Sequence, residues 1–186
     1  IYLHDNYDID PHEIERIDIK SGKGTLNLLG LPLEVKAHPK TPVDVQFSSS
    51  WGAVCGLVYG RATLAEYADG ETGIWNPLLR EVADKVKTFE YDPRCDPKDI
   101  KKSPYEGAIV TVTMNDGAVY EKYFAEAMGS EEMPQSYDDV IKKFRGNVDY
   151  ADSTPSAGSV EKMIEICSNL DECEDVRILN ELMTWE

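Results

Sequence analysis

Hydrophobic and polar residues change their spacing several times along the 186 residues, and each change predicts a new element. Isoleucines that alternate with charged residues predict a strand near 15–20, ended by Ser21-Gly22. Residues 23–42 contain glycines and prolines without a sustained period, which predicts a long connecting loop. The apolar run 44–60 predicts a helix, and residues 63–70 a short helical turn.

The middle of the chain predicts a further helix and more strands. Asn76-Pro77 is a favourable helix start, an N-cap followed by proline, and the chain then leaves as a strand near 86–91. Residues 93–107 are polar and proline-rich, which predicts a loop. Two β-rich runs flank Asn115-Asp116-Gly117, so residues 107–127 predict a hairpin.

The last fifty residues predict helices. Ser136 and Asp139 have capping-box spacing at the start of a helix over 134–147. After a linker at 153–158, two amphipathic helices follow, each with one apolar stripe and little to bury it against. Such helices are expected to pack on a partner surface.

The order of these elements is β-α-α-α-β-β-β-α, then a linker and two helices. It predicts an α+β fold, a two-layer domain with a mostly antiparallel sheet. We expect this domain to cover residues 1–152, with the linker and C-terminal helices at 153–186.

The predicted helix over 44–60 carries an unusual face. Ser48, Gly52, Gly56 and Gly60 recur every fourth residue and form one stripe almost without side-chain volume. Each interior glycine costs about 1 kcal/mol of helix stability relative to alanine, so the stripe needs a compensating reason. Close packing against another element is the first interpretation. Approach of a ligand is the second.

The ligand interpretation concerns the start of this helix. Ser48, Ser49 and Ser50 offer hydroxyls and unpaired backbone N–H groups at the positive end of the helix dipole, which suits a carboxylate or phosphate. The alternative is ordinary helix capping by serine. His38 and Lys40 precede this start and could add positive charge there, or they could be exposed loop charges. Motifs for nucleotide binding, Ser-His-Asp catalysis and zinc hydrolysis are absent from the sequence.

Composition narrows the classes of function. With 19 basic and 35 acidic residues, the net charge of −16 argues against binding to nucleic acid or to anionic membranes. No apolar run reaches the roughly 20 residues of a membrane span, and no secretory signal is visible. Four cysteines without a CxxC pair predict free thiols in a cytoplasmic protein. The three histidines lack metal-ligand spacing, so neither a metal nor another cofactor is expected.

Five segments, in this order and with similar spacing, resemble the C-terminal part of the MmgE/PrpD family. They are DPHEIERIDIKSG, TPVDVQFSSSWGAVCGLVYGRATLAEY, VTVTMNDGAVYEKYF, DDVIKKFRGN and VEKMIEICSNLDECEDVRIL. The family includes 2-methylcitrate dehydratases, cis-aconitate decarboxylases and iminodisuccinate epimerases. Members of that family have a large helical domain and a smaller α+β lid domain.

The resemblance implies that residues of about 10–150 form the lid and that 158–186 return to the helical domain, which would precede Ile1. It also implies a site between the two domains for a small di- or tricarboxylate. The family reaction removes a proton next to a carboxylate, without a general need for a metal, and then loses water or CO2 or regains the proton. Dehydration is the first expectation, and the implied partners are the helical domain and a second copy in a homodimer.

One family position is changed in this sequence. Aligning Phe47-Ser48 with the family pattern places Trp51 where members often have a tyrosine, and an indole cannot replace a phenol in proton transfer. Most acid and base groups of the family lie in the helical domain, so the catalytic residues of this reaction are not expected among these 186. The residues expected at the substrate are Ser48, Ser49, Ser50, Trp51, His38 and Lys40. The rival hypothesis is a non-catalytic α+β module for dimerisation or another interaction.

Overall fold

The computed structural model describes residues 1–90, 107–124, 128–131 and 133–183 of the chain. These residues form two compact units, Ile1–Met133 and Pro134–Glu186. The loop expected at 93–107 lies outside the described residues except for its last position.

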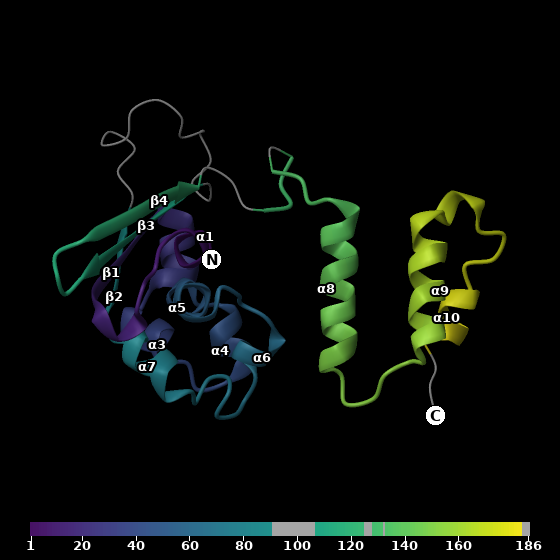
Figure 1. Ribbon diagram of the computed structural model, residues 1–186, viewed down its shortest axis with the longest axis horizontal. Coiled ribbons are helices and arrows are strands. Elements are labelled where there is room, and N and C mark those ends of the chain that lie inside the picture. The colour runs from purple at the N-terminus through teal and green to yellow at the C-terminus, as the bar shows by residue number, and fades with distance from the viewer. Residues whose placement is uncertain (91–106, 125–127, 132, 184–186) are drawn as a thin grey trace. The chain divides into compact units, whose positions relative to one another are not determined.

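A four-stranded mixed sheet forms one layer of the first unit, in the order β2-β1-β3-β4 (Figure 1). Its strands are β1 (Ile14–Ser21), β2 (Val86–Glu90), β3 (Ala108–Met114) and β4 (Val119–Phe124). β1 pairs in parallel with β2 and antiparallel with β3, and β3 pairs antiparallel with β4. The α+β fold class is therefore confirmed, as are the strands expected near 15–20 and 86–91.

The β3–β4 hairpin follows the turn chemistry of its sequence. Gly117 has a φ of 86°, which glycine adopts without the steric cost of a side chain. The Asp116 side chain accepts a hydrogen bond from the Ala118 N–H and closes the turn. The hairpin prediction is confirmed.

Short helices occupy the connection that was predicted as a loop over 23–42. After α1 (Tyr2–Asn6) and a 3₁₀ turn (Pro11–Glu13), the chain forms α2 (Lys23–Thr25), the π-helical turn η2 (Leu26–Gly30) and α3 (Leu33–Ala37). The loop prediction is wrong because each of the last two turns buries an apolar residue, Leu26 and Ala37 respectively. Tertiary burial here outweighs the weak local preference for helix.

The single helix predicted over 44–60 is two helices, α4 (Pro42–Gln46) and α5 (Ser49–Tyr59). Thr41 and Asp44 form a reciprocal capping box that begins α4. Ser48 has extended backbone angles and accepts the Trp51 N–H, so it caps α5 and separates the two helices. The remaining helices of this unit are α6 (Leu64–Tyr67) and α7 (Pro77–Ala83), which begins at Asn76 as predicted.

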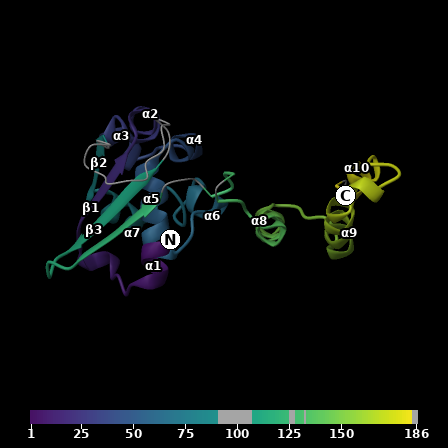
Figure 2. The same cartoon turned by 90° about the horizontal axis from the view of Figure 1, so that it is seen from above.

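α5 is the central helix of the core, and Figure 2 shows it beside the layer of strands together with α7. Trp51, Val54 and Cys55 are fully buried on α5. The sheet meets this helical layer with residues of alternating strand positions, among them Ile17 and Val112. Successive side chains of a strand point to opposite faces. Arg16 and Asp18 of β1 therefore lie on the face away from Ile17, where they form an ion pair.

The glycine stripe of α5 is occupied by other parts of the protein. A Cβ on Gly56 would lie 2.8 Å from the Ile1 nitrogen, and one on Gly60 would lie 2.6 Å from the His4 ring. Both neighbours come from the α1 region, and the His4 Nδ1 is also 2.8 Å from the Leu57 carbonyl oxygen of α5. Close packing therefore accounts for the stripe at these two positions.

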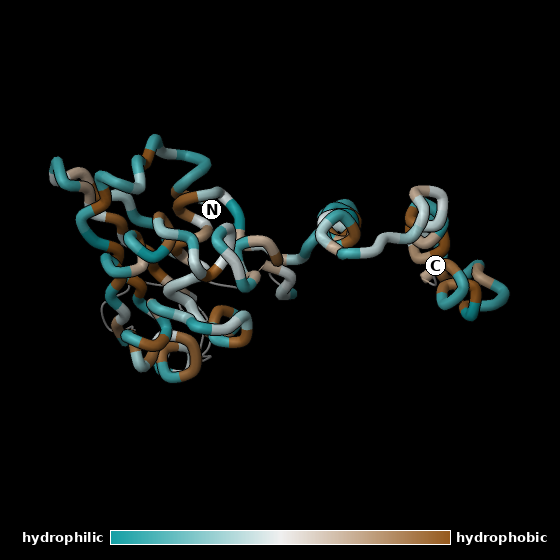
Figure 3. The backbone as a smooth tube through the Cα atoms, turned by 90° about the horizontal axis from the view of Figure 1, so that it is seen from below, coloured by the Kyte–Doolittle hydropathy of each residue, from teal (hydrophilic) through white to brown (hydrophobic). Residues whose placement is uncertain are grey.

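The second unit consists of helices: α8 (Tyr137–Tyr150), α9 (Ala157–Ser168), a 3₁₀ turn (Leu170–Glu172) and α10 (Ile178–Leu182). Ser136 and Asp139 form the predicted capping box at the start of α8. In Figure 3 the helices leading to the C-terminus interleave hydrophobic and hydrophilic positions, as amphipathic helices do. Among the described helices of the chain, none has both the length and the apolar character needed to span a membrane.

α8 belongs to the same compact unit as α9 and α10. Arg145 on α8 and Glu161 on α9 form a bidentate ion pair. The boundary expected near 152 concerns the domains of a longer protein and stays a prediction.

We expect the same glycine-to-alanine substitution to have opposite effects in α5 and α8. Gly56→Ala should lower the free energy of unfolding by about 1–3 kcal/mol, because the new methyl group meets the Ile1 backbone. Gly146→Ala should raise it by about 1 kcal/mol, because nothing lies within 4 Å of its Cβ position and alanine favours the helix. Urea unfolding followed by circular dichroism measures both. Equal effects of the two substitutions would contradict the packing role of the stripe.

Candidate functional site

The start of α5 is the first place where the sequence predicted a site. The Ser48 hydroxyl accepts the Trp51 N–H at 2.9 Å and donates to the Lys36 carbonyl at 2.5 Å. The Ser49 hydroxyl donates to the Leu29 carbonyl at 3.2 Å. These two serines thus fasten the segment that contains η2 and α3 to the beginning of α5. Both serines therefore cap and tether the helix start, and the Ser48 hydroxyl already takes the Trp51 N–H of the first turn.

A lysine that the sequence did not single out stands at this helix start. The Lys36 ammonium donates to the Phe47 carbonyl at 2.6 Å, two residues before α5 begins. It can make further bonds, because an ammonium group carries three donors. Sequence spacing did not reveal Lys36, since α3 brings it here by folding back on α5. Lys36 is therefore the cation that the structure places at the α5 start.

His38 and Lys40, which the sequence proposed for this site, contact groups away from the start of α5. The His38 Nε2 lies 3.0 Å from the Asp84 carboxylate at the end of α7. Lys40 donates its backbone N–H to Asp44, the capping-box residue of α4. The Lys40 ammonium is exposed, and within the described ranges it has no hydrogen bond or ion pair.

Trp51 and Ser50 are fully buried in the first turn of α5. The Trp51 indole donates to the Glu66 carbonyl of α6 at 3.1 Å, so its single donor is in use. The Ser50 hydroxyl has no hydrogen-bond partner within the part of the chain that the structure describes.

The Glu66 side chain is buried, with 2% of its surface exposed, and both carboxylate oxygens are bonded. Arg61 donates to one oxygen at 2.7 Å, and Thr63 donates to the other through its N–H and hydroxyl. Burial alone would raise the pKa of Glu66, but the hydrogen bonds from Arg61 and Thr63 outweigh it and hold that pKa below its ordinary value. The carboxylate therefore stays charged and fixes the beginning of α6.

Tyr67 and Cys55 flank this charge and have raised pKa values. Burial raises the pKa of the Tyr67 phenol, and the nearby Cys55 and Glu66 add to the shift. Burial, and then Glu66, raises the pKa of the Cys55 thiol to about 12, so it is an unreactive thiol at neutral pH. Tyr67 is the second residue near α5 that sequence reasoning missed.

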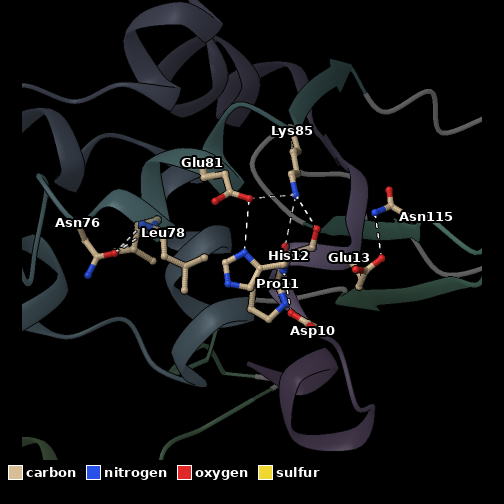
Figure 4. A network of polar contacts seen from close by, with 10 residues as sticks. Asp10, Pro11, His12, Glu13, Asn76, Leu78, Glu81, Lys85 and Asn115 are labelled. Atoms are coloured by element: carbon tan, nitrogen blue, oxygen red, sulfur yellow. Dashed lines mark hydrogen bonds and ion pairs between the residues drawn. The ribbon is translucent and has the colours of Figure 1, made fainter.

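A separate polar network joins the start of β1 to α7 (Figure 4). The Lys85 ammonium lies 3.7 Å from Glu81 and donates to the carbonyls of Pro11 and His12. The His12 ring lies 3.6 Å from the same Glu81 carboxylate. Because His12 and Glu81 are more than half exposed, this network ties two elements together at the surface and forms no enclosed site.

The second unit contains an apolar groove of about 280 Å³ between its helices. Its walls include Phe144 of α8, Met163 and Ile164 of α9, and Leu179 of α10. The apolar faces predicted for these helices thus meet at one surface feature, which has almost no polar lining.

The start of α5 combines the positive end of a helix dipole with the Lys36 ammonium, two features that in general favour an anion. No three of the described histidine, cysteine, aspartate and glutamate residues come together as ligands for a metal ion.

Comparison with known proteins gives two matches. A family model described as the MmgE/PrpD C-terminal domain matches residues 1–170. Human cis-aconitate decarboxylase is 28% identical over 148 residues. That alignment covers 80% of this chain but only 29% of the relative, so the chain spans less than a third of the length of that protein.

We expect Glu66→Gln to lower the free energy of unfolding near pH 7 by about 1–2 kcal/mol, because the amide replaces a charged acceptor of three hydrogen bonds. The folded pKa of Glu66 is lowered, so its contribution is complete above the ordinary value of 4.5 and is lost as the pH falls through the folded value. When the pH is lowered from 7 to below the folded pKa of Glu66, the variant should therefore lose less stability than the unmodified chain. Urea titrations at neutral and acidic pH test this.

The matched control is Asp139→Asn, which changes the exposed capping-box carboxylate of α8. It should cost less than Glu66→Gln at pH 7, because solvent already screens that carboxylate. An equal or larger loss in the control would remove the special role of the buried Glu66.

Proposed function

The chain belongs to the MmgE/PrpD family, and on that premise we propose that it is the C-terminal part of a lyase acting on a small di- or tricarboxylate. The reaction removes a proton next to a carboxylate and then expels water. The observation that supports this proposal is the start of α5, a helix N-terminus with the Lys36 ammonium beside it.

The chemistry explains why such a helix end is useful. A base takes the proton from the carbon next to the carboxylate, and the electron pair forms a carbon–carbon double bond. The hydroxyl on the neighbouring carbon leaves with a proton as water. Negative charge builds up on the carboxylate during the first step, and fixed N–H groups and an ammonium stabilise it. The base and the acid come from the part of the protein that precedes Ile1.

Ser48 and Ser49 hold the α5 start in shape. Of the other residues expected at the substrate, Ser50 and Trp51 are buried in the first turn, and His38 contacts Asp84. The proposed contacts of the substrate are therefore the N–H groups of the α5 start and the Lys36 ammonium. Return of the proton to the other face is an alternative outcome of the same proton abstraction. Loss of CO2 is a different reaction, in which a carbon–carbon bond breaks, its electron pair stays on the substrate, and a carbon of the substrate takes up a proton. The human relative is a decarboxylase, so both products must be measured.

The apolar groove of the second unit supports the same proposal. Because the chain spans 29% of the relative, most of a protein of that length lies outside these residues. We propose that the upstream helical region of the same protein covers the groove. A second copy of the chain is the rival occupant, as the interaction-module hypothesis requires, and light scattering on the chain alone would reveal it.

The complete protein should turn over a polycarboxylate, and the 186-residue chain alone should not. The assay offers 2-methylcitrate and cis-aconitate to each, and follows the new double bond by ultraviolet absorbance and CO2 by its release. Absence of turnover of any di- or tricarboxylate by the folded complete protein would refute the enzyme proposal.

A charge placed at the first residue of α5 tests the anion site directly. In the complete protein, Ser49→Asp should raise the KM for the polycarboxylate about tenfold or more, because a carboxylate at the helix start repels the substrate and competes for the same N–H groups. Ala157→Asp puts the same charge on the first residue of α9 and should leave KM unchanged. Equal KM values for the two variants would place the substrate elsewhere.

A further inference from the structure

Some polar groups in the first turn of α5 already make hydrogen bonds within the protein, and others do not. The hydroxyls of Ser48 and Ser49 are bonded to carbonyls of the preceding segment, and the Trp51 indole is bonded to Glu66. Trp51 is also fully buried. Trp51, the aromatic residue in the first turn of α5, is thus a core residue whose single donor is in use.

A phenol reaches the same turn from α6. The Tyr67 hydroxyl lies 3.3 Å from the position that a Cβ on Gly52 would take. Glycine therefore lets the phenol come against the backbone of α5, where any side chain would crowd it. Within the described residues the Tyr67 hydroxyl makes no hydrogen bond, although it lies next to a helix whose first N–H groups suit an anion. The glycine stripe has a different neighbour here than at Gly56 and Gly60.

The position of Tyr67 is fixed by its neighbour in the chain. The Glu66 carboxylate is held by Arg61 and Thr63, and the Glu66 carbonyl is held by the Trp51 indole. A residue that follows such a bonded residue has little freedom to move away from α5. The Tyr67 side chain also packs against the core cluster, so less entropy is lost when its phenol binds a partner.

Two further features indicate unmet hydrogen-bonding capacity at this turn. The Ser50 hydroxyl is fully buried and has no partner within the described ranges, whereas buried hydroxyls are nearly always bonded. Burial raises the pKa of Tyr67, so its phenol stays protonated at neutral pH and acts as a donor. An O–H donor suits a carboxylate oxygen, the group that the α5 start is proposed to hold.

We propose that Tyr67 is a further substrate-binding residue, whose hydroxyl donates a hydrogen bond to the polycarboxylate at the α5 start, while Trp51 serves the core. This inference rests on the proposed function and names a residue outside the set that the sequence indicated. Glu66 acts through Tyr67 as a positioning residue. A substrate with two or three carboxylates needs donors from more than one element, and Tyr67 supplies one from α6.

The test removes a single oxygen atom from the complete protein. Tyr67→Phe should weaken polycarboxylate binding about tenfold to a hundredfold, the usual effect of losing a hydrogen bond to a charged group. The weaker binding should raise KM by that factor and leave kcat little changed. The control is Tyr59→Phe, which makes the same deletion at the other end of α5, where the phenol bonds Asn76. It should leave KM unchanged.

A second variant keeps the phenol and moves it. Gly52→Ala places a methyl group 3.3 Å from the Tyr67 hydroxyl and should also raise KM, although alanine favours the helix. Circular dichroism melting shows whether each variant is folded. A purely structural role for Tyr67 predicts lower melting temperatures with an unchanged KM.

Calorimetric titration with citrate separates this inference from the proposed function. If the unmodified complete protein binds citrate and Tyr67→Phe binds it equally well, the role of Tyr67 is overturned and the anion site stands. If the unmodified protein neither binds citrate nor turns over any polycarboxylate, the proposed function fails and this inference fails with it. Weaker citrate binding by Tyr67→Phe, with unchanged binding by Tyr59→Phe, supports the proposal.

Discussion

The close approach that α5 permits along its glycine stripe organises the first unit. Because Gly56 and Gly60 have no side chains, the α1 region lies directly against the helix, and His4 reaches the Leu57 carbonyl near its end. At Gly52 the same absence of a side chain admits the Tyr67 hydroxyl. The helix gives up about 1 kcal/mol of local stability at each interior glycine, and contacts with sequence-distant segments offset that cost.

The start of α5 combines two properties that usually compete. The Ser48 and Ser49 hydroxyls and the Trp51 indole are bonded to the surrounding chain, which makes the turn rigid. The remaining backbone N–H groups, the Lys36 ammonium and the Tyr67 phenol are the donors that we propose for the substrate. A rigid frame with a few remaining donors is the arrangement expected of a binding site, because little entropy is lost on binding.

The second unit has the opposite character. α8, α9 and α10 hold together through the Arg145–Glu161 pair and a shared apolar groove, yet the groove is left open. Three short helices enclose too little volume to bury all their apolar faces. Because the chain spans 29% of the human relative, we propose that the remainder of the protein covers this groove.

Local chemistry in the sequence determined the hairpin at Asn115-Asp116-Gly117, the start of α7 at Asn76 and the capping box of α8, since each depends on residues within a few positions. The sequence also predicted the alternation of buried and exposed residues in β1 and the membership of the family. The short helices in place of a loop at 23–42 were not readable, because burial against distant elements decided them. The division between α4 and α5 was missed although the Ser48 cap that makes it is local. For the candidate site, the sequence indicated one part, which is the start of α5 with its serines and glycines. Only the tertiary structure could bring Lys36 and Tyr67 to that turn and bury Trp51, because these contacts join residues 11 to 15 positions apart whose approach depends on how α3 and α6 fold back on α5.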